Sequence, residues 1–468
     1  MARPNAPLAA SQLSGELPSG TNLPAVTLPI VYVALLLVVP ARLAITQIGA
    51  PGTPGNLWGM LCLVLWVLIT LGGWNHRPQS LPRATAGLFA LAVVASYVCG
   101  HTTGWYQPAD IQQALGSGRL WRLVSMDELT AAMTTAADRG LLALAAWLGV
   151  LLVTAEGMRS WRDLELLTTW VVRIAACVAG LGIFQYFTGL NVASYIQIPG
   201  LAPLTDLVTF ERSELVRVVS TSQHPIELGV VMAAILPLTL HRSIHNRTLA
   251  SWIPTAVIAP VILMSVSRSA ILVAGAGVLI LLLRWPNRLR LLFLVGASAA
   301  VVVARLALPG LLGTIRALFA HLGDDPSIAG RTDDYSVVTR VFLETPWFGR
   351  GLFTWVPAYY RTLDNQLLVL LLELGVIGTL LFLTMVLAAI LTAVTCKRRA
   401  DERSAHLGLA IGASLAGITL SFITFDTLGF RQAGGMTFLL LGMAGAVWNL
   451  TRGRRDLLPP GGPISGAS

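Results

Sequence analysis

Residues 366–395 read QLLVLLLELGVIGTLLFLTMVLAAILTAVT, and Glu373 is the single charged residue among them. An α-helix needs about 20 consecutive, mostly apolar residues to cross the hydrocarbon core of a bilayer. The stretch is longer than that, and the basic residues Lys397, Arg398 and Arg399 follow it closely. It therefore predicts a membrane-spanning helix with a charged loop at its carboxyl end.

The composition of the whole chain shows that this stretch is typical of the protein. Of the 468 residues, 55% are hydrophobic and only 12% are charged, and the mean hydropathy is +0.71. Soluble domains carry about a quarter charged residues. So few charges cannot cover the water-facing surface of a soluble protein of this length. The composition predicts a polytopic membrane protein and excludes a soluble enzyme, a secreted disulfide scaffold and a disordered chain.

Scanning the chain for apolar runs predicts an all-α protein with about 12 transmembrane helices. The predicted spans are 24–41, 57–74, 84–100, 139–155, 165–187, 227–240, 250–266, 269–284, 291–308, 366–395, 405–424 and 433–449. Only a short polar stretch separates the seventh run from the eighth, so eleven spans are an alternative. The predicted parts of the chain are a flexible N-terminal tail (1–23), helices 1–9 (24–308), a large structured loop (309–365), helices 10–12 (366–449) and a disordered C-terminal tail (450–468).

Basic residues are distributed unequally between the two sets of loops. The five short loops contain 13 basic residues in 42 positions, whereas the four long loops contain ten in 148. Cytoplasmic loops of membrane proteins carry the excess of positive charge. We therefore predict a multi-pass protein of the cytoplasmic membrane, with the short loops and both termini in the cytoplasm and the long loops outside. The same rule explains the net charge of +9 without a nucleic-acid partner.

The longest predicted outer loop, 309–365, contains two helical patterns. An apolar stripe at Leu311, Ile315 and Phe319 predicts an amphipathic helix that lies on the membrane surface. Thr332, followed by two aspartates, predicts a second helix that begins there and ends before Pro346. A structured loop of this length between spans usually carries function.

Polar clusters occur at three predicted helix ends on the outer side. The first is RVVSTSQHPIELG (217–229), in which Arg217, His224 and Glu227 meet at the start of a span. Ionisable groups at this depth are costly and usually pair with one another or carry function. The alternative is that Glu227 only pairs with a neighbouring arginine for packing.

The second cluster, SVSRS (265–269), places Arg268 between two apolar runs. Arg268 either binds a ligand there or extends its side chain to the membrane interface.

The third cluster comprises GRTDDY (330–335), PWFGRG (346–351) and YYRTLDNQ (359–366). The guanidinium groups of Arg331 and Arg361 are suited to binding phosphate oxygens in pairs, and the glycines of 346–351 would let the backbone approach a ligand. Asp364 is placed to accept a proton, although it could instead cap the helix that follows.

Taken in order, these clusters resemble the O-antigen ligase and O-antigen polymerase superfamily of bacterial envelope glycosyltransferases. Arg217 and His224-Pro225 are similar to the family's outer arginine and His-Pro-Asn-like helix start, and SRSA (267–270) is similar to its Ser-Arg-Gly-Ala motif. Asn365 is followed by nine residues, a glycine, two residues and a second glycine. This spacing matches the one that follows the family's His-Asn pair. The family ligases have His where this chain has Asp364.

The resemblance implies a glycosyltransferase that takes a saccharide from a polyprenyl-diphosphate carrier in the membrane and joins it to a glycan or lipid acceptor. In this interpretation Asp364, or else His224, deprotonates the acceptor hydroxyl, and no metal or other cofactor is expected. The residues predicted to bind the substrates are Arg217, Arg268, Arg331, Arg361, Asn365 and Glu227. The aromatic residues Trp105, Tyr106, Trp121, Trp355, Tyr359 and Tyr360 would stack on sugars or else anchor the protein at the interface.

Two other classes of function fit a chain of this composition. One is a transporter or lipid-linked saccharide flippase, and the other is a related polymerase of lipid-linked wall precursors. A transporter carries its ionisable groups near the bilayer midplane, where this chain has mainly Arg173 and Glu373. The polar clusters lie instead at the predicted outer ends of the helices, which favours the transferase.

Overall fold

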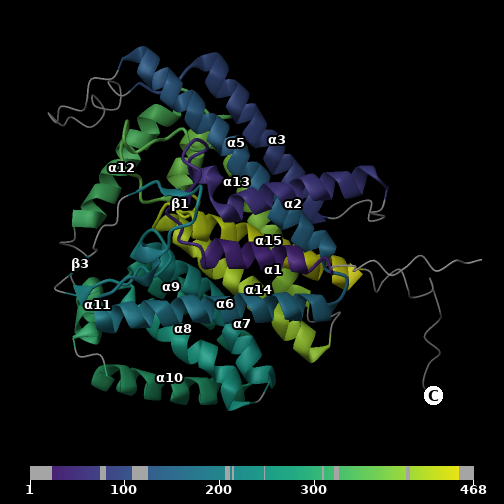
Figure 1. Cartoon of the computed structure of the whole chain (residues 1–468), viewed down its shortest axis with the longest axis vertical. Helices are drawn as coiled ribbons and strands as arrows, with labels where there is room; N and C mark the ends of the chain where they lie inside the picture. Colours follow the sequence, from purple (N-terminus) through teal and green to yellow (C-terminus); the bar gives the residue numbers. More distant parts are fainter. Residues whose placement is uncertain are drawn as a thin grey trace, which may run out of the picture.

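The computed structural model describes residues 24–73, 81–107, 125–205, 211–212, 215–246, 248–307, 310–320, 326–396 and 401–452. Within these ranges the chain is almost entirely helical (Figure 1). The helices are α1 (Thr27–Leu37), α2 (Pro54–Leu71), α3 (Leu81–Thr103), α5 (Met126–Gly157), α6 (Trp161–Thr188), α7 (Pro225–Asn246), α8 (Ile253–Met264), α9 (Arg268–Arg284), α10 (Asn287–Ala307), α11 (Leu311–Ala320), α12 (Pro326–Phe342), α13 (Gln366–Thr395), α14 (Glu402–Leu420) and α15 (Arg431–Arg452).

The described strands are short and form two antiparallel pairs. β1 (Leu43–Ala44) pairs with β2 (Ala202–Pro203), and β3 (Glu211–Arg212) pairs with β4 (Leu215–Val216). The predicted all-α class is therefore confirmed.

Each of the twelve predicted apolar runs contains a helix. Among the described residues, the helices that are long and apolar enough to cross a membrane are eight in number: α2, α3, α5, α6, α7, α13, α14 and α15. The helices in the remaining four predicted runs, α1, α8, α9 and α10, are not both long and apolar enough. The chain is a multi-pass membrane protein, whereas about 12 spans remains a prediction. The predicted N-terminal tail and residues 453–468 of the predicted C-terminal tail lie outside the described residues.

Helices α7 and α15 form the centre of the bundle, and most of their residues are buried. In Figure 1, α1, α14 and α15 lie in the middle of the molecule and α10 lies along one edge. Glycines let α15 approach α5 closely: a Cβ at Gly442 would lie 2.8 Å from the Cβ of Thr154, and one at Gly445 would lie 2.8 Å from the Cβ of Ala155. Small residues at helix contacts are typical of membrane bundles, in which close packing replaces hydrophobic burial.

Two helices lie in the predicted loop 309–365. α11 confirms the helix predicted from the apolar stripe at 311–319. The start of the second predicted helix was wrong, because α12 begins at Pro326 rather than at Thr332, whereas its end at Phe342 falls before Pro346 as predicted. Proline is favoured in the first turn of a helix because its fixed φ suits that position and its missing N–H is not needed there.

Helix α13 is broken at Gly375, which has φ 64° and ψ −170°. The break leaves backbone groups of the helix without intrahelical partners, and the segment 345–351 supplies partners for them. The N–H of Val376 donates to the carbonyl of Pro346 at 2.8 Å, while the N–H groups of Arg350 and Gly351 donate to the carbonyl of Glu373 at 3.0 and 2.9 Å. This segment is therefore fixed against the middle of a predicted span.

Helix ends that the sequence places on the same side of the membrane do meet at one end of the bundle. The hydroxyl of Thr221, just before α7, donates to the carbonyl of Leu37 at the end of α1, at 2.6 Å. The N–H of Leu428, between α14 and α15, donates to the side-chain oxygen of Gln366 at the start of α13, at 2.5 Å. We refer to this end of the bundle, formed by the end of α1, the starts of α7 and α13 and the loop between α14 and α15, as the mouth.

We expect Gly375→Ala to destabilise the fold by about 2 kcal/mol or more, because a positive φ is unfavourable for alanine and because the new Cβ would lie 2.4 Å from the backbone of Trp347. The melting temperature of the purified protein in detergent measures this effect. Gly275→Ala is the matched control, since a Cβ there meets nothing within 4 Å. Equal melting temperatures for the two variants would contradict the role of the break.

Candidate functional site at the mouth of the bundle

The segment that precedes α7 is anchored at the mouth by buried hydrogen bonds. The side-chain oxygen of Gln185, on α6, accepts the N–H groups of Val219 at 3.0 Å and Ser220 at 2.8 Å. Ser220 has a positive φ of 52°, and its hydroxyl donates to the carbonyl of Val178 at 2.8 Å. Hydrogen bonds to α6 therefore fix the path of residues 217–224.

Glu227 is fully buried and connects the start of α7 to the start of α15. One carboxylate oxygen accepts the N–H of Gln223 at 2.8 Å, and the other accepts the N–H of Gln432 at 2.7 Å. Backbone N–H groups stabilise a buried carboxylate strongly. Glu227 was predicted to bind substrate, but the structure places it beneath the mouth, where it holds two helix starts together.

Arg217 brings the first two sequence clusters together. Its side chain is buried, and its Nε donates to the carbonyl of Ser265 at 2.8 Å. Ser265 lies in the turn between α8 and α9, where Ser267 caps α9 and Arg268 is the first, partly buried residue of that helix. Arg217 and Arg268 are thus both positioned by the same turn at the mouth.

His224 stands next to Pro225, the first residue of α7. Its Nδ1 accepts the N–H of Ile226 at 3.1 Å, and its ring packs edge-on against Phe430 with centroids 5.9 Å apart. Burial, together with the positive charge of Arg217, lowers the pKa of His224 to about 4. The ring is therefore neutral near pH 7. Because Nδ1 uses its lone pair to accept, the proton is on Nε2, and His224 is a hydrogen-bond donor rather than a base.

Asn365, and not Asp364, caps α13. The side-chain oxygen of Asn365 accepts the N–H groups of Leu367 at 3.0 Å and Leu368 at 3.3 Å. The alternative that Asp364 serves as the helix cap is therefore wrong, and the carboxylate of Asp364 is exposed at the mouth. Asn365 was predicted to bind substrate, but the cap already occupies its side-chain oxygen.

Asp426 lies in the loop between α14 and α15 and places a second carboxylate near Asp364. Its Oδ1 accepts the N–H of Gly429 at 3.3 Å. Burial, together with the negative charge of Asp364, raises the pKa of Asp426 to about 6. A buried site and a nearby like charge both disfavour the ionised form of a carboxylate. Asp426 therefore keeps its proton to a higher pH than an ordinary aspartate does.

The other predicted arginines occupy different surroundings. Arg361 forms an ion pair of 2.7 Å with Asp334 on α12, which ties the segment before α13 to that helix. Arg331 belongs to α12, but its side chain lies outside the described residues. The structure thus places Arg217 and Arg268 at the α8–α9 turn and Arg361 at α12.

The aromatic residues and the Gly-x-Gly motif of the third cluster have structural roles. Trp105, Tyr106, Trp355 and Tyr360 are buried, and Trp355 stacks on Tyr360 with centroids 4.7 Å apart. They form a core for the loop instead of a sugar platform or an interfacial belt. A Cβ at Gly349 would lie 2.4 Å from the backbone of Glu373, so this glycine lets the loop approach α13, not a ligand. Trp121 lies outside the described residues.

The O-antigen ligase family model matches residues 253–383, which extend from α8 into α13. This match supports membership of the O-antigen ligase superfamily. No curated protein matches the chain. The matched residues include Arg268, Asp364 and the break at Gly375, whereas Arg217 and His224 precede them. The matched family model indicates a membrane glycosyltransferase-like role in glycan assembly.

Sequence reasoning missed two polar residues at the mouth. Asp426 lies in a short loop that carries no family motif, and its importance arises only from its proximity to Asp364. Gln432 accepts the hydroxyl of Ser222 at 2.5 Å and donates to the carbonyl of Leu36 at 3.1 Å. The sequence did contain a signal for both residues: Asp426 and Gln432 precede the last apolar run, 433–449, on the predicted outer side.

We expect Asp426→Asn to stabilise the protein relative to wild type at pH 7.5 but not at pH 4. The pKa of about 6 in the folded protein exceeds that of about 3.9 in the unfolded chain, so ionisation of Asp426 opposes folding increasingly as the pH rises from about 4 to 6. A gain of about 1–3 kcal/mol at pH 7.5 follows from this difference, and thermal unfolding at the two pH values measures it. The gain should shrink in an Asp364→Asn background, and a gain that is the same at both pH values would contradict the shift.

Proposed function

We propose that the protein transfers a saccharide from a polyprenyl-diphosphate carrier to a hydroxyl group of a glycan or lipid acceptor, on the outer face of the cytoplasmic membrane. The observation that carries this proposal is that the exposed Asp364 lies at the mouth near Asp426, the same end of the bundle at which Arg217 and His224 lie. A proton acceptor and cationic groups at one helix end are what transfer from a lipid diphosphate requires.

In this mechanism Asp364 accepts the proton of the acceptor hydroxyl while the hydroxyl oxygen attacks the anomeric carbon of the donor. The bond between that carbon and the diphosphate oxygen breaks, and the lipid diphosphate leaves with the electron pair. Asp426 supports Asp364 as a second carboxylate nearby, because burial and the negative charge of Asp364 raise the pKa of Asp426. General bases of this kind contribute about 10²–10⁴-fold to a rate.

Arg217 and Arg268 are proposed to bind the diphosphate. Negative charge grows on the leaving diphosphate in the transition state, so guanidinium groups that are already fixed stabilise it more than they stabilise the bound donor. The hydrogen bond of Arg217 to the carbonyl of Ser265 provides this fixation. His224, with its proton on Nε2, adds a neutral donor to the same substrate oxygens. Arg331, Arg361, Asn365 and Glu227 are proposed to shape this substrate site.

The structure supports a transporter less well than it supports a transferase. Glu373, the acid expected near the midplane, uses one carboxylate oxygen to accept the N–H of Trp355 at 3.2 Å. It therefore fastens the loop to α13. Ligation and polymerisation use the same donor chemistry, and the proposal covers both.

Asp364→Asn and Arg217→Ala should each lower transfer at least about 100-fold, because one removes the base and the other removes a cation that binds the leaving diphosphate. The measurement is the amount of transferred glycan in cells that express each variant in place of the native chain. Arg340→Ala is a control on α12 that should retain activity, since Arg340 is exposed there. If both site variants retain full activity at normal membrane levels, the proposed site is wrong.

Asp364→His tests the departure from the family pattern in the same assay. Histidine can also accept a proton, so this variant should retain much more activity than Asp364→Asn. Equal loss in the two variants would show that Asp364 does not act as a base.

His224→Gln should retain most of the activity, whereas His224→Ala should lose about tenfold. Glutamine keeps an N–H donor but cannot accept a proton as a base, so the comparison separates the two roles of His224. Equal and complete loss in both variants would instead assign His224 as the base.

A further inference from the structure

Three histidines gather at the end of α7 that is opposite the mouth. His241 and His245 are one turn apart on α7, and His406 lies near the start of α14. One ring nitrogen from each histidine lies within 4.8 Å of the others. A helix rises about 1.5 Å per residue, so His241 is about 25 Å from His224 along α7. The cluster is therefore separate from the proposed transferase site.

The hydrogen bonds of the cluster define where each proton lies. The indole N–H of Trp285 donates to Nε2 of His406 at 2.7 Å, so the neutral His406 ring carries its proton on Nδ1. Nδ1 of His406 is 2.9 Å from Nδ1 of His241, which must accept and therefore carries its own proton on Nε2. That Nε2 donates to Glu165 on α6 at 3.0 Å.

The third histidine presents a lone pair to the same place. Nδ1 of His245 is 3.0 Å from the carbonyl of His241 and must donate to it, because a carbonyl cannot donate. This bond fixes the tautomer and leaves Nε2 of His245 with a lone pair. Two histidines four residues apart on one helix face are a common arrangement for binding zinc.

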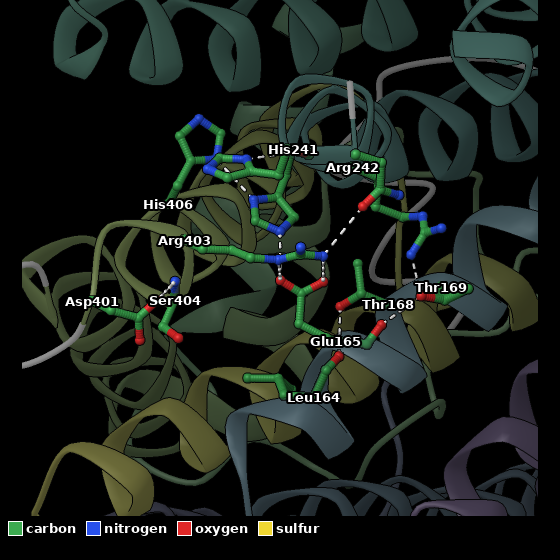
Figure 2. A network of polar contacts seen from close by, with 12 residues as sticks. Leu164, Glu165, Thr168, Thr169, His241, Arg242, Asp401, Arg403, Ser404 and His406 are labelled. Carbon is green, nitrogen blue, oxygen red and sulfur yellow. Dashed lines mark hydrogen bonds and ion pairs between the residues drawn. The ribbon is translucent and has the colours of Figure 1, made fainter. Parts of the chain in front are cut away.

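Glu165 provides the support that metal-binding histidines usually have. Figure 2 shows His241 and Arg403 both directed at the carboxylate of Glu165, and the Nε of Arg403 donates to this carboxylate at 2.8 Å. A carboxylate on the far nitrogen of a histidine fixes the ring and makes the near nitrogen a better ligand. His241 is fully buried, whereas His245 and His406 are partly exposed, which leaves a path for an ion from the solvent.

We propose that His241, His245 and His406 bind a divalent transition-metal ion with imidazole preference, such as Zn²⁺, and that the ion joins α7 to α14. In tetrahedral zinc sites, nitrogen ligands lie about 2.0–2.1 Å from the metal and hence about 3.3 Å from one another. The two Nδ1 atoms are already close to that spacing. With three protein ligands, the fourth position is left for water.

Trp285 competes with the metal in this arrangement. When the ion takes the lone pair of Nδ1 of His406, the proton of that nitrogen moves to Nε2, where the indole N–H then has no lone pair to bind. Trp285→Phe removes this competing donor and keeps an aromatic ring against Phe293, with which Trp285 is in edge contact at 5.7 Å. The variant should therefore bind metal several-fold more tightly.

The test uses the full-length protein, purified in detergent and stripped with EDTA. Zinc is added, unbound metal is removed, and bound zinc is measured by mass spectrometry. Co²⁺ serves as a second probe, because its visible spectrum reports nitrogen ligands. We expect one ion per chain in the wild type and an affinity at least tenfold lower in His245→Ala and in Glu165→Gln.

His101→Ala is the matched control, because His101 also bonds through Nδ1 to the carbonyl four residues before it, at 2.9 Å, but lies on α3 outside the cluster. It should bind zinc as the wild type does. The melting temperature of the wild type should rise with Zn²⁺ and fall again with EDTA, which tests the site even if a variant fails to fold. Absence of stoichiometric zinc from the wild type, or equal loss in His101→Ala and His245→Ala, would overturn the proposal.

Discussion

The break of α13 at Gly375 is the constraint on which the rest of the structure depends. A span interrupted in its middle exposes backbone groups that the membrane cannot satisfy, so the chain must bring its own partners to that depth. The segment 345–351 does so through the carbonyls of Pro346 and Trp347 and the N–H groups of Arg350 and Gly351. The short connection that follows this fixed segment ends at the start of α13, where Asp364 lies at the mouth.

The mouth is held together by polar groups that are themselves buried. Glu227 joins α7 to α15, Gln185 holds the segment before α7, and Gln366 holds the loop that contains Asp426. These hydrogen bonds position the groups that would contact the substrate. The three residues that form the bonds take no part in the proposed reaction. The cost of the arrangement is that Asp426 is kept buried and near another carboxylate, and ionisation of a carboxylate in such surroundings destabilises a fold.

The sequence predicted the helices well because apolar runs and arginine-rich loops depend on local composition. It also predicted that Arg217 and Arg268 lie at helix ends on the same, outer side. It could not predict partners that arise from packing: Glu227 bonds to the N–H of Gln432, which is 205 residues away, and Asp426 matters only beside Asp364. The spacing of His241 and His245 was visible in the sequence, but their third partner is on another helix.

The central claim is that this protein consumes a lipid-linked saccharide. The most direct measurement is to delete the gene, extract the membrane lipids and analyse them by mass spectrometry. The account predicts that a polyprenyl-diphosphate saccharide accumulates and that it disappears when the wild-type chain is restored. Loss of an imported or exported small molecule, with no accumulated lipid-linked saccharide, would contradict the account.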